Sequence, residues 1–592
     1  MRRRIACIAA IAVFVATAGM AHRSFGAASD PFTAEASKAA ASNPSGVTCS
    51  LKIGGDARFQ VGERIPVSLS FTSDRPGYKV YVDPGPIFAT IDDTFHVDPV
   101  EGVRIFPPLT MGGYSGPGPR TAPLSSTSTE VSLTLNDFVR FDRPGVYHVY
   151  DASGRVTTGK DVFSPSLPAA TQPVIITIVP QDPAWAAEQV KQADRLLGTN
   201  PLSNFDAGRF DPANTLRYLG TQDAAREMLN VVSRDMEPGA NTVVTQTCVK
   251  GLNEFPDRPW LISEMQSDIA RPDYTVNQYF LTTLAWNTVW QDNSIPSVEL
   301  ANEKQMQDYK RVMIRLWLDT EAALSSKSKA AVPMTVFSLL EMAWQGLELK
   351  GVPEIRKTTL ALVRMLPDIF SKLPRRAQEY IVQDDIDWPH VKGRAMLAPL
   401  LATWPTIAPP TNNDYDYPDR MLRRIYDLSP SEGRKLVLAE VASEHPRVDE
   451  DAISILPNKP LPELDSVLAA RLSDKSLESE EVVCRAISRY ATKAILPQVK
   501  TRYESTEGQW SCAPQASVLV YFLRVDPDYG VEKVKKALDN RKNTGCYHTI
   551  FSDIARRGYD PRLLSIARQH QSDPDSEVAR DAAKLIYTRA AP

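Results

Sequence analysis

Three prolines near the C-terminal end of the chain recur at the length of a helical hairpin. Pro497, Pro527 and Pro561 are separated by 30 and 34 residues, and segments with apolar residues at helical spacing lie between them. Because proline is tolerated in the first turn of a helix but not in its interior, each one marks the start of the second helix of a pair. Periods of this length are typical of solenoids, in which each helix pair buries its apolar face against the next. The sequence therefore predicts an all-α helical solenoid.

The N-terminal part of the chain follows a different pattern. Apolar and polar residues alternate within 58–71, 78–82 and 131–135, which is the period of half-buried strands. Asp142, Gly145 and Tyr147 then stand at the entry to a further strand. This arrangement resembles the tyrosine corner of immunoglobulin-like sandwiches, where the phenol ties the strand to the preceding loop. We expect an all-β Ig-like sandwich here.

The first 28 residues have the pattern of a cleaved secretory signal. Three arginines at positions 2–4 precede an apolar run at 5–18 and then small residues suited to a signal peptidase. No later stretch reaches the ~18 apolar residues needed to cross a bilayer. We therefore expect an exported protein, periplasmic or extracellular, with no transmembrane segment.

The change from strand pattern to helix pattern falls at residues 180–183. Asp182 and Pro183 there predict a helix cap and a first turn. The predicted division of the chain is a signal peptide at 1–28, a flexible linker at 29–46, the Ig-like sandwich at 47–181, and the helical repeat domain at 182–592, irregular in its middle and regular from about residue 420.

Several segments of the helical part are similar to a known repeat family. In residues 212–228 a helix ends at glycine and an alanine-rich helix follows, and 574–585 repeats the second part of this pattern. Both resemble HEAT repeats of the phycobilisome-lyase type. Together with 422–434 and 455–465, they make the chain similar to uncharacterised secreted bacterial HEAT-repeat proteins with an N-terminal Ig-like sandwich. The resemblance implies a fold but no reaction.

The net charge of the chain bears on which class of partner it can bind. The formal charge is −4, and removal of residues 1–28, which hold four arginines and no acid, makes it −8. Nucleic-acid-binding proteins carry a basic footprint. We expect no nucleic-acid partner.

Motifs of catalytic or cofactor chemistry are incomplete. Residues 154–160 have the spacing of a phosphate-binding loop, yet Asp161 stands where Ser or Thr must reach magnesium. The seven histidines are scattered without metal-ligand spacing. We expect a hairpin turn at 154–160, no catalytic residue, no cofactor and no metal.

Binding energy at interfaces concentrates on Trp and Arg. The residues that could line a ligand surface on this ground are Trp388, His390, Arg423, Arg424, Arg434 and Lys435. The alternative is that the tryptophan fills space between hairpins and the arginines form a solvated helix face.

Two cysteines lie near the starts of first helices in consecutive pairs. Neighbouring helix axes lie about 8–10 Å apart, whereas a disulfide needs Cα atoms within about 7 Å. A disulfide between Cys512 and Cys546 is predicted if those helix ends converge, with buried thiols as the alternative.

From this pattern we expect a non-enzymatic secreted or envelope protein whose helical repeats bind another macromolecule, a protein, since solenoids offer long binding surfaces. Two alternatives stay open. One is an enzyme or enzyme accessory with a site in the irregular helical middle region, and the other is a purely structural surface module.

Overall fold

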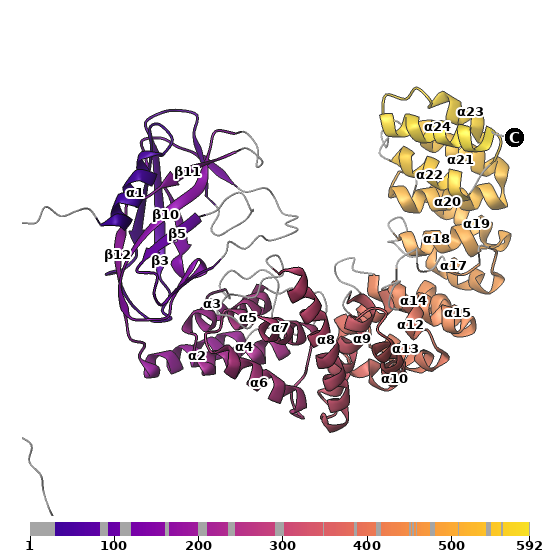
Figure 1. Ribbon diagram of the computed structural model, residues 1–592. Coiled ribbons are helices and arrows are strands. Elements are labelled where there is room, and N and C mark those ends of the chain that lie inside the picture. Colours follow the sequence, from indigo (N-terminus) through magenta and orange to yellow (C-terminus); the bar gives the residue numbers. More distant parts are fainter. Residues whose placement is uncertain are drawn as a thin grey trace, which may run out of the picture. The chain divides into compact units, whose positions relative to one another are not determined.

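The computed structural model describes most of the chain beyond residue 29 (Figure 1). The described residues are 30–82, 93–106, 120–159, 165–198, 210–234, 243–290, 301–346, 349–383, 388–409, 416–443, 445–448, 452, 455–457, 459–473, 480–506, 508–539, 546–557 and 560–590. The expected signal peptide therefore lies outside the described residues, as do Lys160 and Asp161.

A strand-rich region is followed by a long helical region, which confirms the predicted fold class. The described chain forms two compact units. The first extends to Glu227, beyond the last strand, and the second continues from Met228.

The strands of the first unit form two main sheets. Their bounds are β1 Val47–Ile53, β2 Arg58–Gln60, β3 Pro66–Ser73, β4 Lys79–Tyr81, β5 Asp93–Asp98, β6 Val103–Ile105, β7 Thr121–Pro123, β8 Thr129–Thr134, β9 Val139–Phe141, β10 Gly145–Thr157, β11 Ser166–Ala170 and β12 Val174–Val179. One sheet has the order β1-β3-β8. The other has the order β2-β12-β10-β4-β7, and β5 and β11 also pair with β10; β6 and β9 form a separate ribbon.

Alternating burial makes the two sheets a sandwich. In β1, buried Val47, Cys49 and Leu51 alternate with exposed residues, so one face points into the core. Leu69 and Phe71 of β3 belong to the same buried cluster as Val149 and Ile176 of the second sheet. The predicted hairpin turn at 154–160 is wrong for its first four residues, because 154–157 belong to strand β10, which pairs antiparallel with β11 as far as Thr157 and Ser166.

The tyrosine corner is confirmed. The hydroxyl of Tyr147, two residues into β10, donates to the carbonyl oxygen of Arg143 at 2.9 Å. The phenol ring is buried, so the loop before β10 is tied to the strand by a hydrogen bond sheltered from water.

The expected flexible linker at 29–46 is wrong over much of its length. Helix α1 spans Pro31–Ala41 and is capped by the Asp30 side chain, with proline in the first turn. Phe32 lies against Tyr150 with ring centroids 5.2 Å apart, and Ala36 is fully buried. The alanine-rich segment has no long apolar stripe, and packing on the sandwich stabilises it as a helix (Figure 1).

Two helices beyond the last strand belong to the first unit. These are α2 (Pro183–Gly198) and α3 (Phe210–Leu219). Asp137, in the short 3-10 turn after β8, accepts from Arg217 Nη1 at 2.6 Å and from the Tyr218 hydroxyl at 2.8 Å. Gln181 Nε2 donates to the carbonyl oxygens of Val61 and Leu219, both at 3.0 Å. Helix α3 is therefore held on the sandwich by hydrogen bonds that Arg217 and Tyr218 donate to Asp137 and by those of Gln181.

We predict that Asp137→Ala destabilises the first unit by about 2 kcal/mol. The buried Arg217 guanidinium would lose its carboxylate, and an unpaired buried charge is costly; the value is reduced because Asp137 is partly exposed. Calorimetry of the full chain measures this. Glu130→Ala, which breaks an exposed pair with Lys52, is the control and should change stability by less than about 0.5 kcal/mol. Equal effects of the two changes would contradict the docking role.

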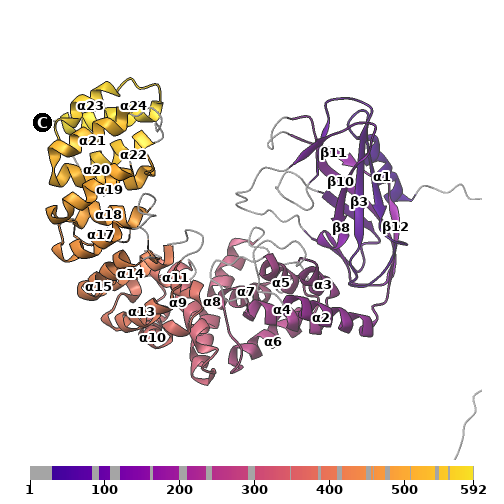
Figure 2. The ribbon, with the colours of Figure 1, turned by 180° about the vertical axis from the view of Figure 1, so that it is seen from behind.

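The helices of the second unit follow one another along the chain (Figure 2). Helix α4 (Gln222–Arg234) starts in the first unit, and the rest are α5 Val243–Asn253, α6 Arg258–Ala270, α7 Gln278–Val289, α8 Glu303–Ala323, α9 Val332–Gln345, α10 Pro353–Ile369, α11 Arg375–Gln383, α12 Trp388–Val391, α13 Leu397–Thr403, α14 Asp416–Leu428, α15 Pro430–Ala442, α17 Asp465–Arg471, α18 Glu481–Tyr490, α19 Leu496–Ser505, α20 Cys512–Val525, α21 Pro527–Asp539, α22 Tyr547–Arg557, α23 Leu563–Gln569 and α24 Ser576–Ala590. The middle is irregular as expected, since α12 and α13 are short and 3-10 turns interrupt the helices.

The terminal part consists of stacked helix pairs. Pro497 lies in the first turn of α19, Pro527 begins α21, and Pro561 precedes α23 by two residues, so the proline pattern marks the second helices as predicted. The first helices α18, α20 and α22 pack in succession, and α22 packs on α24 (Figures 1 and 2). Residues 516–523 of α20 are all buried, because neighbours cover this helix on several sides.

Glycines allow two of the hairpins to close tightly. A Cβ atom on Gly530 of α21 would lie 2.6 Å from the backbone nitrogen of Leu523 in α20. A Cβ on Gly433 of α15 would lie 2.6 Å from the Cα of Tyr426 in α14. Each glycine is the third residue after the proline that opens its helix. The backbones of paired helices thus meet where there is no side chain.

We predict that Gly530→Ala lowers the free energy of unfolding by about 1–3 kcal/mol. Alanine is the better helix former by about 1 kcal/mol, but the clash with the Leu523 backbone forces the two helices apart, and overpacking of this kind has the larger cost. Urea unfolding of the full chain is the measurement. Gly393→Ala is the control, because a Cβ there meets only the Val391 carbonyl oxygen, at 3.8 Å. A stabilised Gly530→Ala protein would show that the close approach is unimportant.

Candidate binding surface

Two of the residues expected at a ligand surface pack against each other instead. Trp388 of α12 is 3% exposed, and the Arg424 guanidinium of α14 lies 5.1 Å from its ring centroid. Arg424 Nε also donates to the Val382 carbonyl oxygen at the end of α11, at 2.9 Å. This arginine therefore joins three helices and covers a buried tryptophan, a structural cation–π contact.

The other expected residues do not join them in one surface. His390 stacks on Trp344 of α9, with centroids 5.5 Å apart. Arg434 pairs with Glu463, and Lys435 with Glu432 at 2.8 Å. Arg423 lies on the same helix as Arg424. The tryptophan fills space between helices and the α15 cations form a solvated, ion-paired face, which is the alternative interpretation of these residues.

We predict that Arg424→Met lowers the free energy of unfolding by about 1–2 kcal/mol. It removes the guanidinium from the Trp388 ring and leaves the Val382 carbonyl oxygen without its donor. Arg434→Met is the matched control, since its pair is half-exposed and surface pairs contribute about 0–1 kcal/mol. Urea unfolding compares the two, and a harmless Arg424→Met would contradict the structural role.

The predicted disulfide is present in the structure. Cys512, at the start of α20, is bonded to Cys546, just before α22, and their Cα atoms are 4.7 Å apart. The helix starts therefore converge to well within the spacing of their axes. Cys49, Cys248 and Cys484 are buried free thiols.

The best candidate surface is formed by the second helices of the terminal pairs. We call it the outer-row surface and define it by Lys500, Glu504, Asp526, Asp528, Tyr529, Glu532, Lys533, Lys535, Asp539 and Arg562. Asp528, Glu532, Lys535 and Asp539 are exposed at a spacing of four, three and four residues, so they form one stripe along α21. Charged side chains in a single stripe present a defined pattern to a partner.

Contacts between neighbouring helices hold this surface in place. Lys500 of α19 pairs with Asp526, which precedes α21, at 2.6 Å. The Tyr529 hydroxyl donates to Glu504 of α19 at 2.7 Å. Arg562, just before α23, pairs with Asp528 at 2.6 Å. Three successive second helices are thereby linked through their side chains.

Tyr529 lies at the centre of these contacts. The ammonium nitrogens of Lys500 and Lys533 lie 4.0 Å and 4.9 Å from its ring centroid. Burial, followed by the hydrogen bond to Glu504, raises the pKa of the Tyr529 phenol, while the same hydrogen bond lowers the pKa of Glu504. Tyr529 is therefore a neutral donor and Glu504 an anion at neutral pH.

A buried ion network joins two first helices that are not adjacent in the stack, α18 and α22. Arg485 of α18 reaches Asp553 of α22 at 3.6 Å, although α20 lies between them in the stack, and Arg557 donates to Asp553 at 3.0 Å. Burial raises the pKa of Asp553, and the cation of Arg485 opposes this. Sequence reasoning missed this network, because the three residues are neighbours only after the hairpins stack.

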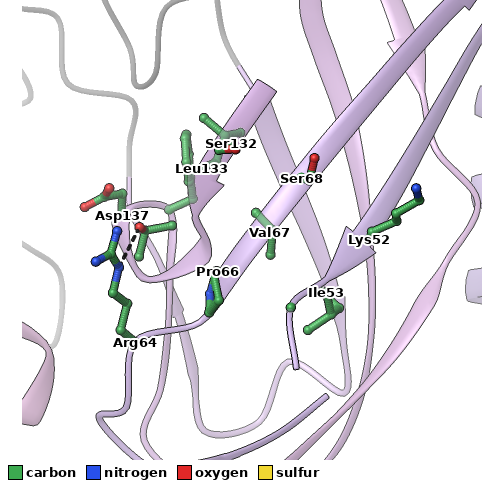
Figure 3. Close-up of a pocket in the computed structure, with 12 residues that line it drawn as sticks. Lys52, Ile53, Arg64, Pro66, Val67, Ser68, Ser132, Leu133 and Asp137 are labelled. Carbon is green, nitrogen blue, oxygen red and sulfur yellow. Dashed lines mark hydrogen bonds between the residues drawn. The ribbon is translucent and has the colours of Figure 1, made fainter. Parts of the chain in front are cut away.

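The sandwich carries a groove of about 560 Å³ over the β1-β3-β8 sheet (Figure 3). Pro66 and Ser68 of β3 lie along its middle, with Lys52 of β1 on one side and Arg64 and Asp137 on the other. Asp137 is already held by α3. Hydroxyls and two cations suit a ligand with acceptor groups. The sequence gives no signal for these residues, because alternation of apolar and polar residues indicates a strand and not a binding site.

Within the described residues, no three His, Cys, Asp or Glu side chains gather as metal ligands would. None of the helices in the described part of the chain has the length and apolarity of a membrane span. Comparison of the chain with models of protein families finds no match, and comparison with curated proteins finds none either.

Proposed function

We propose that this is a non-enzymatic exported protein whose helical repeats, of the HEAT type, bind a protein partner through the outer-row surface. The observation that carries the proposal is the chain of side-chain contacts across α19, α21 and the start of α23. It fixes a charged, partly aromatic surface before any partner arrives.

Preorganisation gives this surface its value for binding. Immobilising a flexible side chain on association costs about 0.5–1.5 kcal/mol. Lys500, Glu504 and Tyr529 are already held by one another, so a partner would not have to order them. Exposed charges of both signs along α21 favour a partner with a complementary charge pattern.

We predict that a photo-reactive amino acid at Glu532, in the exposed stripe of α21, crosslinks the mature full-length protein to its partner in the native envelope fraction. The same group at Glu303, an exposed acid in the first turn of α8, is the control and should give no product of that mass. Mass spectrometry identifies the product. A product from both positions, or from neither, would contradict the assignment.

A charge swap sharpens the test without removing an ion pair. Lys535 and Asp539 pair at 2.6 Å, one turn apart, and both are about half exposed. The double change Lys535→Glu with Asp539→Lys keeps opposite charges at the two positions but reverses the pattern that a partner meets. We expect about tenfold less crosslinking from position 532 with unchanged urea unfolding, since mismatched charges at an interface are unfavourable. Full crosslinking would place the binding surface elsewhere.

A further inference from the structure

The core of the sandwich contains a carboxyl group that finds no partner among the described residues. Asp151 of β10 is 0% exposed, and neither of its side-chain oxygens has a hydrogen-bond partner in the described part of the chain. The backbone of Asp151, in contrast, is hydrogen-bonded to Thr171. The Asp151 N–H donates to the Thr171 hydroxyl at 3.0 Å, and the Thr171 N–H donates to the Asp151 carbonyl oxygen at 2.9 Å. An ionised carboxylate in this position would be a buried charge without compensation.

The described cation that acts on Asp151 is already bound to another carboxyl group. Arg155 of β10 contacts the Asp93 carboxylate of β5 through Nε at 2.8 Å and 3.0 Å and through Nη2 at 2.7 Å. Ser153 donates to the same carboxylate at 2.7 Å. The Asp93 carboxyl is thus bound by Arg155 and Ser153, and its electrostatic effect raises the pKa of Asp151.

Among the described residues, the other ionisable groups on the surrounding strands do not neutralise Asp151. Strand β5 carries His96 and Asp98 besides Asp93, and the His96 ring stacks on Tyr150. From β1, Asp151 is faced by Cys49, whose thiol has a pKa raised by burial and then by the carboxyls of Asp151 and Asp93. Strands β11 and β12 carry no ionisable side chain. Burial raises the pKa of Asp151 well above its ordinary value, Asp93 adds to the rise, and Arg155 opposes it.

The partner strand of β10 changes beside Asp151. Residues 145–149 of β10 pair with β12, whereas 152–157 pair with β11. The change falls at Tyr150 and Asp151, where Thr171 bridges the gap. On the other edge, β5 pairs with residues 148–153 without a break, so a charge on Asp151 acts on the edge of β11 and β12, where Thr171 makes the connection.

We propose that Asp151 is a pH-sensitive lock of the sandwich, closed while its carboxyl is protonated and loosened at β10 and β11 when rising pH ionises it. An unfolded aspartate ionises at about pH 3.9. Between that pH and the higher value in the closed sandwich, opening releases one proton. The opening equilibrium then rises about tenfold per pH unit in this window and levels off above it.

Hydrogen exchange of the full chain, corrected for intrinsic rates, tests the lock between pH 5 and pH 8. We expect protection of the β10 and β11 amides to fall with rising pH by up to about tenfold per unit. Helix α20 packs on α22, which carries Asp553, and burial also raises the pKa of that carboxyl, so the reference for β10 is the Asp151→Asn protein and not α20. A wild-type protein in which protection of β10 does not fall between pH 5 and pH 8 overturns the proposal.

Asp151→Asn should remove the slope of β10 and leave that of α20 unchanged, because the amide is neutral at every pH. Asp151→Ser, a smaller neutral change, gives the same test if the amide does not fit the core. Loss of the slope in either folded variant supports the lock, and retention of the wild-type slope overturns it.

Discussion

A helix pair in this array cannot bury its apolar face alone. Residues 516–523 of α20 are buried because α18, α21 and α22 all pack on that helix. Hydrophobic burial, which is the main favourable term in folding, is thus shared between pairs. The ion pair from Arg485 to Asp553 depends on this stacking, and so do the contacts between second helices that form the outer-row surface.

The first compact unit extends further along the chain than the strand pattern indicates. The alternation of apolar residues stops at Val179, yet α2 and α3 belong to the same compact unit. The reason lies in polar chemistry: one carboxylate on the sandwich accepts from an arginine and a tyrosine that are adjacent in α3. Charge-assisted hydrogen bonds of this kind are strong and directional. The spacing of apolar residues in the sequence does not predict them.

Local patterns predicted much of the fold and little of the candidate site. Proline in first turns marked α19, α21 and α23, and Tyr147 marked the corner before β10, because these signals act over a few residues. Helix α1 was missed since its stability comes from Phe32 and Ala36 packing on distant strands. Trp388 and Arg424 suggested a ligand surface but meet each other, and the contacts of Tyr529 appear only when two helices stack.

The disulfide limits how the helix pairs can unfold one after another from the C-terminal end. A stack of repeats can lose its outermost pair first, since each pair contacts only its neighbours. Cys512 and Cys546 close a loop of 34 residues that contains α20 and α21 whole. Once α23 and α24 have detached, the next step cannot release α22 alone from the start of α20. Unravelling from this end must then take the linked segment together, at a larger free-energy cost than a single helix pair.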